Sequence, residues 1–72
     1  MISYEPFWET LKEKNVSTYV LIRDKHVSSS TLQRMRYNES ISLQTVEDLC
    51  NALQCGVCDI VEIIPDKDTS KN

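Results

Sequence analysis

The chain has 72 residues, of which 40% are hydrophobic and 26% charged, and its formal net charge is −3. That length allows one small domain whose core is near the lower size limit for independent folding. No apolar run approaches the roughly 18 residues of a membrane-spanning helix, which excludes a transmembrane helix. A single Gly and two Pro favour a mainly helical chain, because strands joined by tight turns need more of both.

The charges are unevenly distributed along the chain. Residues 1–36 carry six Lys or Arg and four acidic residues, whereas residues 37–72 carry two Lys and seven acidic residues, so the net charge runs from +2 to −5. The overall acidity argues mildly against a nucleic-acid partner. The distribution matters more than the sum, because a polarised molecule can bind a polyanion with one face and keep the other solvated.

The first predicted helix is capped by Ser3 and has Pro6 in its first turn, where the missing N–H of proline costs nothing. Asn15 ends it well, because Asn tolerates the left-handed conformation found just past helix ends. Apolar residues recur in this segment at i, i+3, i+4 and i+7, which is the spacing of a core-facing stripe: Tyr4, Phe7, Trp8 and Leu11.

Two short helices are predicted next, joined by a very short turn around His26. Ser28 caps the later one, in which Leu32 and Met35 face inward at i, i+3. Two helices joined in this way form a helix-turn-helix. The earlier of the two is predicted over residues 18–25, with Ser17 as its cap, and its candidate apolar contacts are Val20, Leu21, Tyr19 and Ile22.

A fourth predicted helix is capped by Ser42 and broken by Gly56. Residues 57–60 fit one more turn. The segment "IVEII", residues 60–64, fits either a short strand or an apolar tail that packs back onto the core. The apolar stripe of the fourth helix again follows i, i+3, i+4 and i+7: Val46, Leu49, Cys50 and Leu53.

The predicted fold class is therefore all-α, a bundle of four to five short helices with room for a short terminal strand pair. We expect one domain over residues 1–64, followed by a polar, disordered tail over residues 65–72. The N-terminal "MISYEPFW" has no basic start and no small-residue cleavage site, which predicts a cytoplasmic protein rather than a secreted one.

The segment "HVSSSTLQRMRYN", residues 26–38, carries the main functional prediction. If the third helix, about residues 29–37, lies in a DNA major groove, its first turn meets base edges and phosphates. Small hydroxyl residues suit that place, since they allow close approach and offer hydrogen bonds. Gln is suited to adenine and Arg to guanine. Four residues form one stripe on the side of this helix opposite Leu32 and Met35. They are the predicted base contacts: Ser29, Ser30, Gln33 and Arg34.

Residues at the edges of this helix fit contacts with DNA phosphates. Each feature also has an ordinary structural explanation, because serines before a helix cap it and a Gln/Arg stripe is often only a solvated face. The consistent placement of the short turn, the inward apolar pair and the outward polar stripe favours DNA contact. The candidate phosphate contacts on this argument are Ser28, Arg36, Tyr37, Ser40 and Ser42.

Three segments carry a resemblance to a known family: "ISYEPFWETL" at the N-terminus, then "VSTYVLIRDKHVSSSTLQRMR", then "ISLQTVEDLCNALQCGVCDIVEI". In this order they resemble the Cro- and phage-repressor-type helix-turn-helix regulators, the xenobiotic-response-element (XRE) class, in their small single-domain branch. The resemblance covers nearly all of the chain. It implies a repressor-like fold of five helices and sequence-specific binding to duplex DNA. It also implies that Thr18 touches a phosphate and supports the base-contacting assignment of the stripe.

Some positions depart from the pattern of that family. Asn38 stands after the third helix where many members have Gly, and His26 stands in the turn where Gly is usual. Ile22 replaces a small residue early in the second helix. Glu39 is acidic where many members are basic, which weakens the expectation of a phosphate contact there.

Other candidate sites are weaker. Cys50, Cys55 and Cys58 have the spacing C-x4-C-x2-C, but zinc sites usually use four ligands in paired knuckles. We interpret Cys50 and Cys55 as small core residues and Cys58 as an exposed thiol suited to a redox role. No Ser/His/Asp set has a catalytic spacing and no Gly-rich phosphate loop is present. We therefore expect no metal, no cofactor, no small-molecule ligand and no enzymatic activity.

The sequence thus predicts a DNA-binding transcriptional regulator, a repressor that occupies an operator as a homodimer. A single module of this size buries only about 600–1,000 Å² on DNA, which is little for operator specificity. The alternative is a protein-interaction module that keeps the fold but binds a partner protein, and the net acidity supports that alternative.

Overall fold

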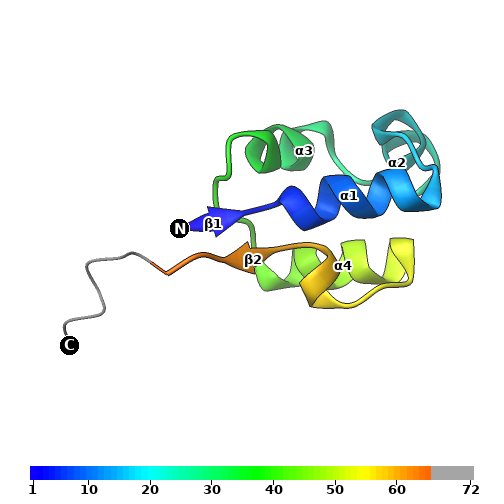
Figure 1. The fold of residues 1–72 in the computed structure, drawn as a ribbon. Helices are drawn as coiled ribbons and strands as arrows, with labels where there is room; N and C mark the ends of the chain where they lie inside the picture. The colour runs from blue at the N-terminus through cyan, green and yellow to red at the C-terminus, as the bar shows by residue number, and fades with distance from the viewer. Residues whose placement is uncertain (66–72) are drawn as a thin grey trace.

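The structure, a computed structural model, describes residues 1–65. The predicted disordered tail therefore lies outside the described residues, apart from Pro65. In Figure 1, α1 crosses the middle of the view, α2 and α3 lie above it, and α4 lies below it. The elements in chain order are β1 (Ile2–Ser3), α1 (Glu5–Lys14), α2 (Thr18–Asp24), α3 (Ser29–Arg36), α4 (Leu43–Leu53), the 3-10 helix η1 (Val57–Asp59) and β2 (Glu62–Ile63).

The two strands form a small antiparallel sheet in which Ile2 lies opposite Ile63 and Ser3 opposite Glu62. Beyond the strands, the N–H of Ile64 donates to the carbonyl of Met1 at 2.8 Å. The "IVEII" segment is therefore a strand in its second half, and the N-terminus of the chain supplies its partner. The structure confirms the predicted fold class, a helical bundle with a short terminal strand pair, and the extra turn at residues 57–59.

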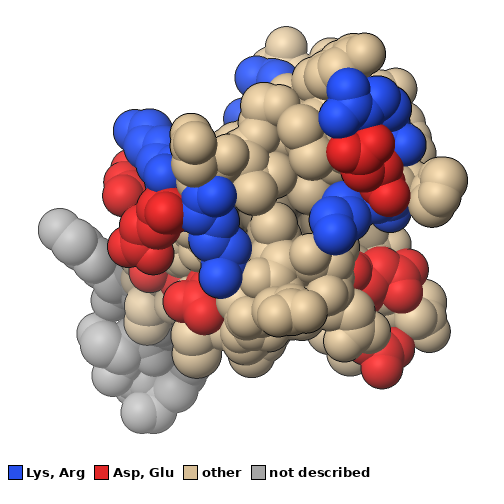
Figure 2. Space-filling model, turned by 90° about the vertical axis from the view of Figure 1, so that its right-hand side faces the viewer, with Lys and Arg blue, Asp and Glu red and all other residues tan. Residues whose placement is uncertain are grey.

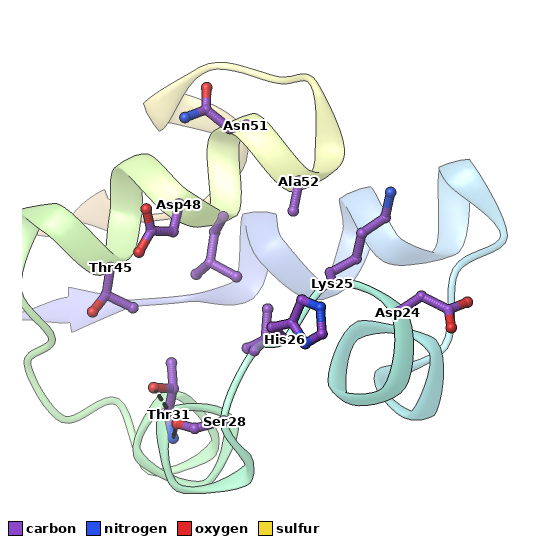
Figure 3. Close-up of a pocket in the computed structure, with 11 residues that line it drawn as sticks. Asp24, Lys25, His26, Ser28, Thr31, Thr45, Asp48, Asn51 and Ala52 are labelled. Atoms are coloured by element: carbon purple, nitrogen blue, oxygen red, sulfur yellow. Dashed lines mark hydrogen bonds between the residues drawn. The ribbon is translucent and has the colours of Figure 1, made fainter.

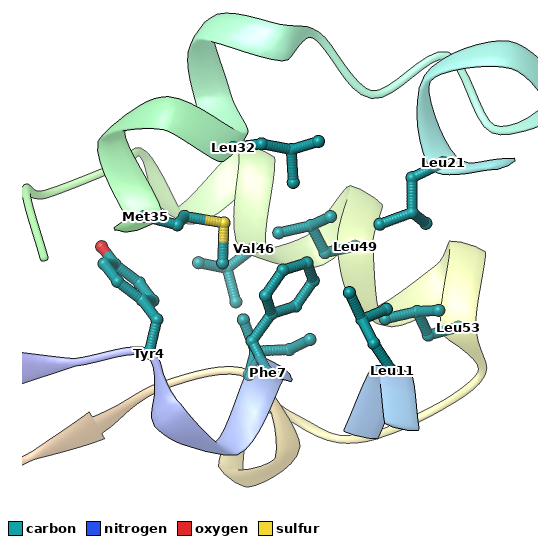
Figure 4. Close-up of a cluster of buried hydrophobic side chains, with 10 residues drawn as sticks. Tyr4, Phe7, Leu11, Leu21, Leu32, Met35, Val46, Leu49 and Leu53 are labelled. Carbon is teal, nitrogen blue, oxygen red and sulfur yellow. The ribbon is translucent and has the colours of Figure 1, made fainter. Parts of the chain in front are cut away.

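The core is formed by the apolar stripes that the sequence predicts. Phe7 of α1 lies at its centre, with Leu32 and Met35 of α3 on one side and Leu49 of α4 nearby (Figure 4). Burial of each such side chain stabilises the fold by about 1.5–3 kcal/mol. Among residues 1–65, the buried apolar residues are Tyr4, Phe7, Leu11, Leu21, Leu32, Met35, Val46, Leu49, Leu53 and Ile60.

Three of the four predicted serine caps are confirmed. Ser17, Ser28 and Ser42 each accept a hydrogen bond from the backbone N–H three residues later, at 3.1–3.2 Å. Such a cap satisfies one of the N–H groups that a helix start leaves unpaired. The first helix differs: Tyr4 is its cap residue without a side-chain bond, and the hydroxyl of Ser3 accepts from the N–H of Glu5 instead.

The prediction that Gly56 breaks α4 is wrong. The helix ends at Leu53 because Gln54 takes the left-handed conformation, with φ of 54°, and Gly56 has an ordinary φ of −95°. Left-handed backbone is rare for a residue with a side chain. The predicted left-handed end at Asn15 is confirmed, with φ of 57°, and Asn38, just after α3, has the same φ.

In α2 the candidate apolar contacts separate into two groups. Leu21 is fully buried and Val20 is half-buried, whereas Tyr19 and Ile22 are exposed. A seven-residue helix presents too few residues to bury all four, so the two residues on its outer side face solvent.

Candidate nucleic-acid interface

Helices α2 and α3 are joined by residues 25–28, the short turn that the sequence predicts. His26 has φ of 61° and so takes the left-handed conformation at the position where Gly was expected from the resemblance. The N–H of Val27 donates to the carbonyl of Leu21 at 3.1 Å, and its side chain packs against the core. The turn is therefore tight without glycine, since His is one of the residue types enriched in this conformation.

The outer face of α3 presents the predicted base-contacting stripe to solvent. Ser29, Ser30, Gln33 and Arg34 are all exposed, and Leu32 and Met35 on the opposite side are buried. Of the six candidate phosphate contacts, Thr18 at the start of α2 is half-buried. The other five are exposed: Ser28, Arg36, Tyr37, Ser40 and Ser42.

Some of these hydroxyl groups already have partners within the chain. The Oγ of Ser28, besides capping α3, lies 3.1 Å from the Oγ of Ser30 and 2.9 Å from the Oγ1 of Thr31. The Oγ of Ser42 lies 2.9 Å from the Oγ1 of Thr45. A hydroxyl has one donor and two acceptor positions. Ser28 therefore already uses all three positions within the chain and Ser42 uses two, so a phosphate contact by Ser28 would replace one of its internal hydrogen bonds.

The charges near the helix-turn-helix are not equally available. The guanidinium of Arg23 binds the carboxylate of Asp24 at 2.7 and 2.9 Å and lies over the ring of Tyr19. The hydrogen bond from Arg23 lowers the pKa of Asp24, so this pair stays ionised and its charges cancel locally. Within residues 1–65, no carboxylate lies within ion-pairing distance of Arg34 or Arg36. The positive charge of the interface therefore comes mainly from α3.

Figure 2 shows the side of the molecule nearest α2. On this side Lys and Arg side chains alternate with Asp and Glu and do not merge into one basic patch. A polyanion that met this side would therefore depend on individually placed cations rather than on a uniform field.

Trp8 lies beside the end of α3, a contact that the sequence alone did not reveal. It is half-buried, and its ring meets the ring of core residue Phe7 edge-on, with 4.8 Å between centroids. The Cζ of Arg36 lies 5.4 Å from the centroid of the indole, within the range of a cation–π interaction. Trp8 also lines a groove of about 410 Å³ together with residues of α1, α2 and the loop between them: Leu11, Lys12, Asn15, Val16, Ser17, Thr18 and Val20.

The loop that follows α3 is attached to the start of α1 by Tyr4. The phenol of Tyr4 donates to the carbonyl of Glu39 at 2.6 Å, and the N–H of Tyr4 donates to the Oδ1 of Asn38 at 3.3 Å. These bonds hold the backbone between Tyr37 and Ser40, two of the candidate phosphate contacts. In the sequence, Tyr4 is recognisable only as a member of the apolar stripe of the first helix.

Replacing Tyr4 by Phe should remove the phenol hydrogen bond with little change in apolar burial. We expect the free energy of unfolding to fall by about 0.5–1.5 kcal/mol in urea titrations near neutral pH. Burial raises the pKa of the Tyr4 phenol above its ordinary value of 10.0. The protonated phenol therefore makes its full contribution to the free energy of unfolding below pH 10, and this contribution is lost as the pH rises through the raised pKa. The alkaline loss of stability should be smaller in the variant, and an identical alkaline profile would contradict this role.

A second concavity of about 600 Å³ lies between the helix-turn-helix and α4 (Figure 3). Lys25, His26 and Ser28 line one side of it, and Asp48 and other α4 residues line the other. Its lining mixes basic, acidic and neutral groups. None of the four predicted base-contacting residues lines it, so this cleft is separate from the outer face of α3.

The cysteines lie on α4 and in the segment that follows it. Cys50 and Cys55 are half-buried against the core, as interpreted from the sequence, and Cys58 is exposed. Burial raises the pKa of the Cys55 thiol, which makes it a weaker nucleophile at neutral pH. Among residues 1–65 there is no group of three His, Cys, Asp or Glu placed to hold a metal ion. In the same part of the chain, every helix is too short or too polar to cross a membrane.

The short turn, the buried inner side of α3 and its exposed polar face together define a helix-turn-helix domain. Residues 7–66 match the Cro/C1-type HTH DNA-binding domain, and the chain belongs to this family. The crystal structure of the transcriptional regulator VanUg, Form II, is similar, with a TM-score of 0.80 and 31% sequence identity. The match covers 90% of this chain and 87% of that chain. No curated protein matches the chain significantly.

Proposed function

We propose that the protein is a transcriptional regulator that binds a specific duplex sequence with α3 in the major groove and represses by occupying an operator. The observation that carries this proposal is the outer face of α3, where Ser29, Ser30, Gln33 and Arg34 are exposed together on a helix held by buried Leu32. The family and the similarity to a protein described as a transcriptional regulator support it. The mechanism is steric and requires no catalysis.

The chemistry of the stripe suits base recognition. The amide of Gln33 matches the donor and acceptor pattern of adenine, and the guanidinium of Arg34 matches the two acceptors of guanine. Ser29 and Ser30 are small enough to let the first turn of α3 approach the DNA closely. Each well-made bidentate contact discriminates against a wrong base by about 1–3 kcal/mol.

Phosphate contacts would hold the domain in register on the duplex. We assign this role to residues that surround the stripe, on the start of α2, the cap and end of α3, and the loop before α4. Such contacts carry no sequence information themselves, but they fix the orientation from which bases are read. The assigned residues are Thr18, Ser28, Arg36, Tyr37, Ser40 and Ser42.

We also propose that the working form is a homodimer, located in the cytoplasm, on a two-fold symmetric site. One domain buries about 600–1,000 Å² of its own surface on DNA, and two domains on half-sites one helical turn apart double the contact. The exposed apolar residues on and beside the strand pair, Met1, Ile63 and Ile64, are candidates for the dimer surface.

Selection of binding sequences from random duplexes, followed by titration at two salt concentrations, tests the function. We expect an enriched inverted repeat with half-sites about 10 base pairs apart. Binding should weaken steeply with salt, because each phosphate contact releases counterions. No enrichment, together with tight capture of one protein partner, would instead favour the protein-interaction alternative.

A further inference from the structure

We propose that Trp8 is a positioning residue for DNA binding: its indole holds the guanidinium of Arg36 in place for a DNA phosphate. The proposal rests on the proposed function and deepens it, since it adds a residue of α1 to an interface otherwise built from the helix-turn-helix. Trp8 itself need not touch a base.

The indole is a firmly held platform. Phe7, the neighbouring residue, is fully buried, and its ring contacts the ring of Trp8 at a centroid distance of 4.8 Å and an interplanar angle of 70°. One part of Trp8 packs against the core while the remainder is open to solvent. Its orientation is therefore set by the core, and the position of Arg36 over the ring follows from it.

A cation–π contact orders a long arginine side chain without consuming its hydrogen bonds. The guanidinium is planar, and its N–H donors point outward in that plane, so a ring beneath the group leaves donors available for a phosphate. No carboxylate of residues 1–65 lies within ion-pairing distance of Arg36. The side chain is thus held by an aromatic ring and not by an acid that would repel the polyanion.

The surroundings of Trp8 fit the same role. Trp8 lines one groove with Lys12, one helical turn further along α1, and with Thr18 at the start of α2. Two phosphate-contacting candidates from different helices are therefore associated with one indole: Thr18 shares the groove with Trp8, and Arg36 lies over the ring. Lys12 and Thr18 in the groove and Arg36 over the ring thus place polar groups from three helices around Trp8.

A double-mutant cycle on the selected duplex tests the proposal. The variants are Trp8→Leu, Arg36→Ala and the two combined, with Trp8→Phe as the conservative variant that keeps an aromatic ring. Thermal melts of each free protein establish that it is folded, and Arg36→Ala changes only an exposed residue. Dissociation constants are measured over a range of salt concentrations.

We expect Arg36→Ala to weaken binding to all sequences alike and to reduce the salt slope by about one phosphate contact. Trp8→Leu should weaken binding about two- to fivefold, the affinity equivalent of a solvent-exposed cation–π contact, when Arg36 is present. It should have no further effect when Arg36 is absent, and Trp8→Phe should recover most of the loss. Equal losses from Trp8→Leu in both backgrounds would overturn the proposal and leave Trp8 a purely structural residue.

The two proposals fail in different ways. A wild-type chain that binds no duplex overturns the proposed function, whereas salt-dependent wild-type binding with no coupling in the cycle overturns only the role of Trp8.

A fluorescence measurement tests the contact between Trp8 and Arg36 without DNA, because Trp8 is the only tryptophan in the chain. We expect Arg36→Ala to change the emission of the free protein and the matched control Arg23→Ala, whose guanidinium lies over Tyr19, to leave it unchanged. Emission that does not respond to Arg36→Ala would contradict the contact itself.

Discussion

Replacing Leu32 by Ala is expected to lower the free energy of unfolding by about 2–5 kcal/mol. Leu32 is 3% exposed and points from α3 into the core (Figure 4), so the substitution leaves a cavity at the place where α3 docks. A domain of this size has little stability to spare. The loss should appear as a lower midpoint in urea and thermal unfolding, with weaker DNA binding because α3 is no longer held in position.

Gln33→Ala is the matched control for this substitution. Gln33 is the next residue on the same helix and is exposed, so its replacement should change stability by less than about 0.5 kcal/mol. The two variants thus separate the inner side of α3 from its outer side. An unchanged melting curve for Leu32→Ala would mean that α3 is docked the other way round, and the proposed reading face would be wrong with it.

The second large effect is expected from Arg34→Ala, which should reduce affinity for the selected site by about 1–3 kcal/mol and relax the preference at one base pair. Arg34 is exposed on the outer face of α3 and has no carboxylate partner among residues 1–65. Its guanidinium can therefore make a bidentate contact with guanine. Repeating the sequence selection with the variant measures the change in preference directly.

Arg36→Ala provides the contrast for Arg34→Ala, because it removes the same charge two residues further along α3. A phosphate contact at Arg36 predicts weaker binding to every duplex with an unchanged base preference. Arg34→Lys keeps the charge of Arg34 but not its planar pair of donors, and should lose the preference while keeping much of the salt dependence. If Arg34→Ala leaves both affinity and preference intact, Arg34 does not contact a base.

The helices and three of their four capping serines could be predicted from the sequence, because they depend on neighbours within four residues along the chain. The apolar spacing predicted α1, α3 and α4, and the buried residues Phe7, Leu32 and Leu49 confirm it. The residue at which α4 ends could not be predicted from the sequence. Gln54 has no sequence signal for left-handed backbone, whereas Gly56 has a strong one that the fold does not use.

Part of the candidate interface, the outer face of α3, could also be predicted from the sequence, whereas the residues that support it could not. The four residues of the α3 stripe share one face of one helix, and helical periodicity alone brings them together. Trp8 and Tyr4 could not be found by this reasoning, because their contacts with Arg36 and Glu39 join segments that are distant in the sequence. In the sequence both are simply members of an apolar stripe.

The sequence by itself determined the helical class, the short turn between α2 and α3, and the outward stripe of α3, since these follow from local periodicity and capping. Only the tertiary structure decided that Ile2 and Ser3 pair with Ile63 and Glu62, that Tyr4 holds the loop after α3, and that Arg36 rests over Trp8. Contacts of that kind depend on which helix faces pack together, and the amino-acid pattern of each helix leaves that choice open until the shared core forms.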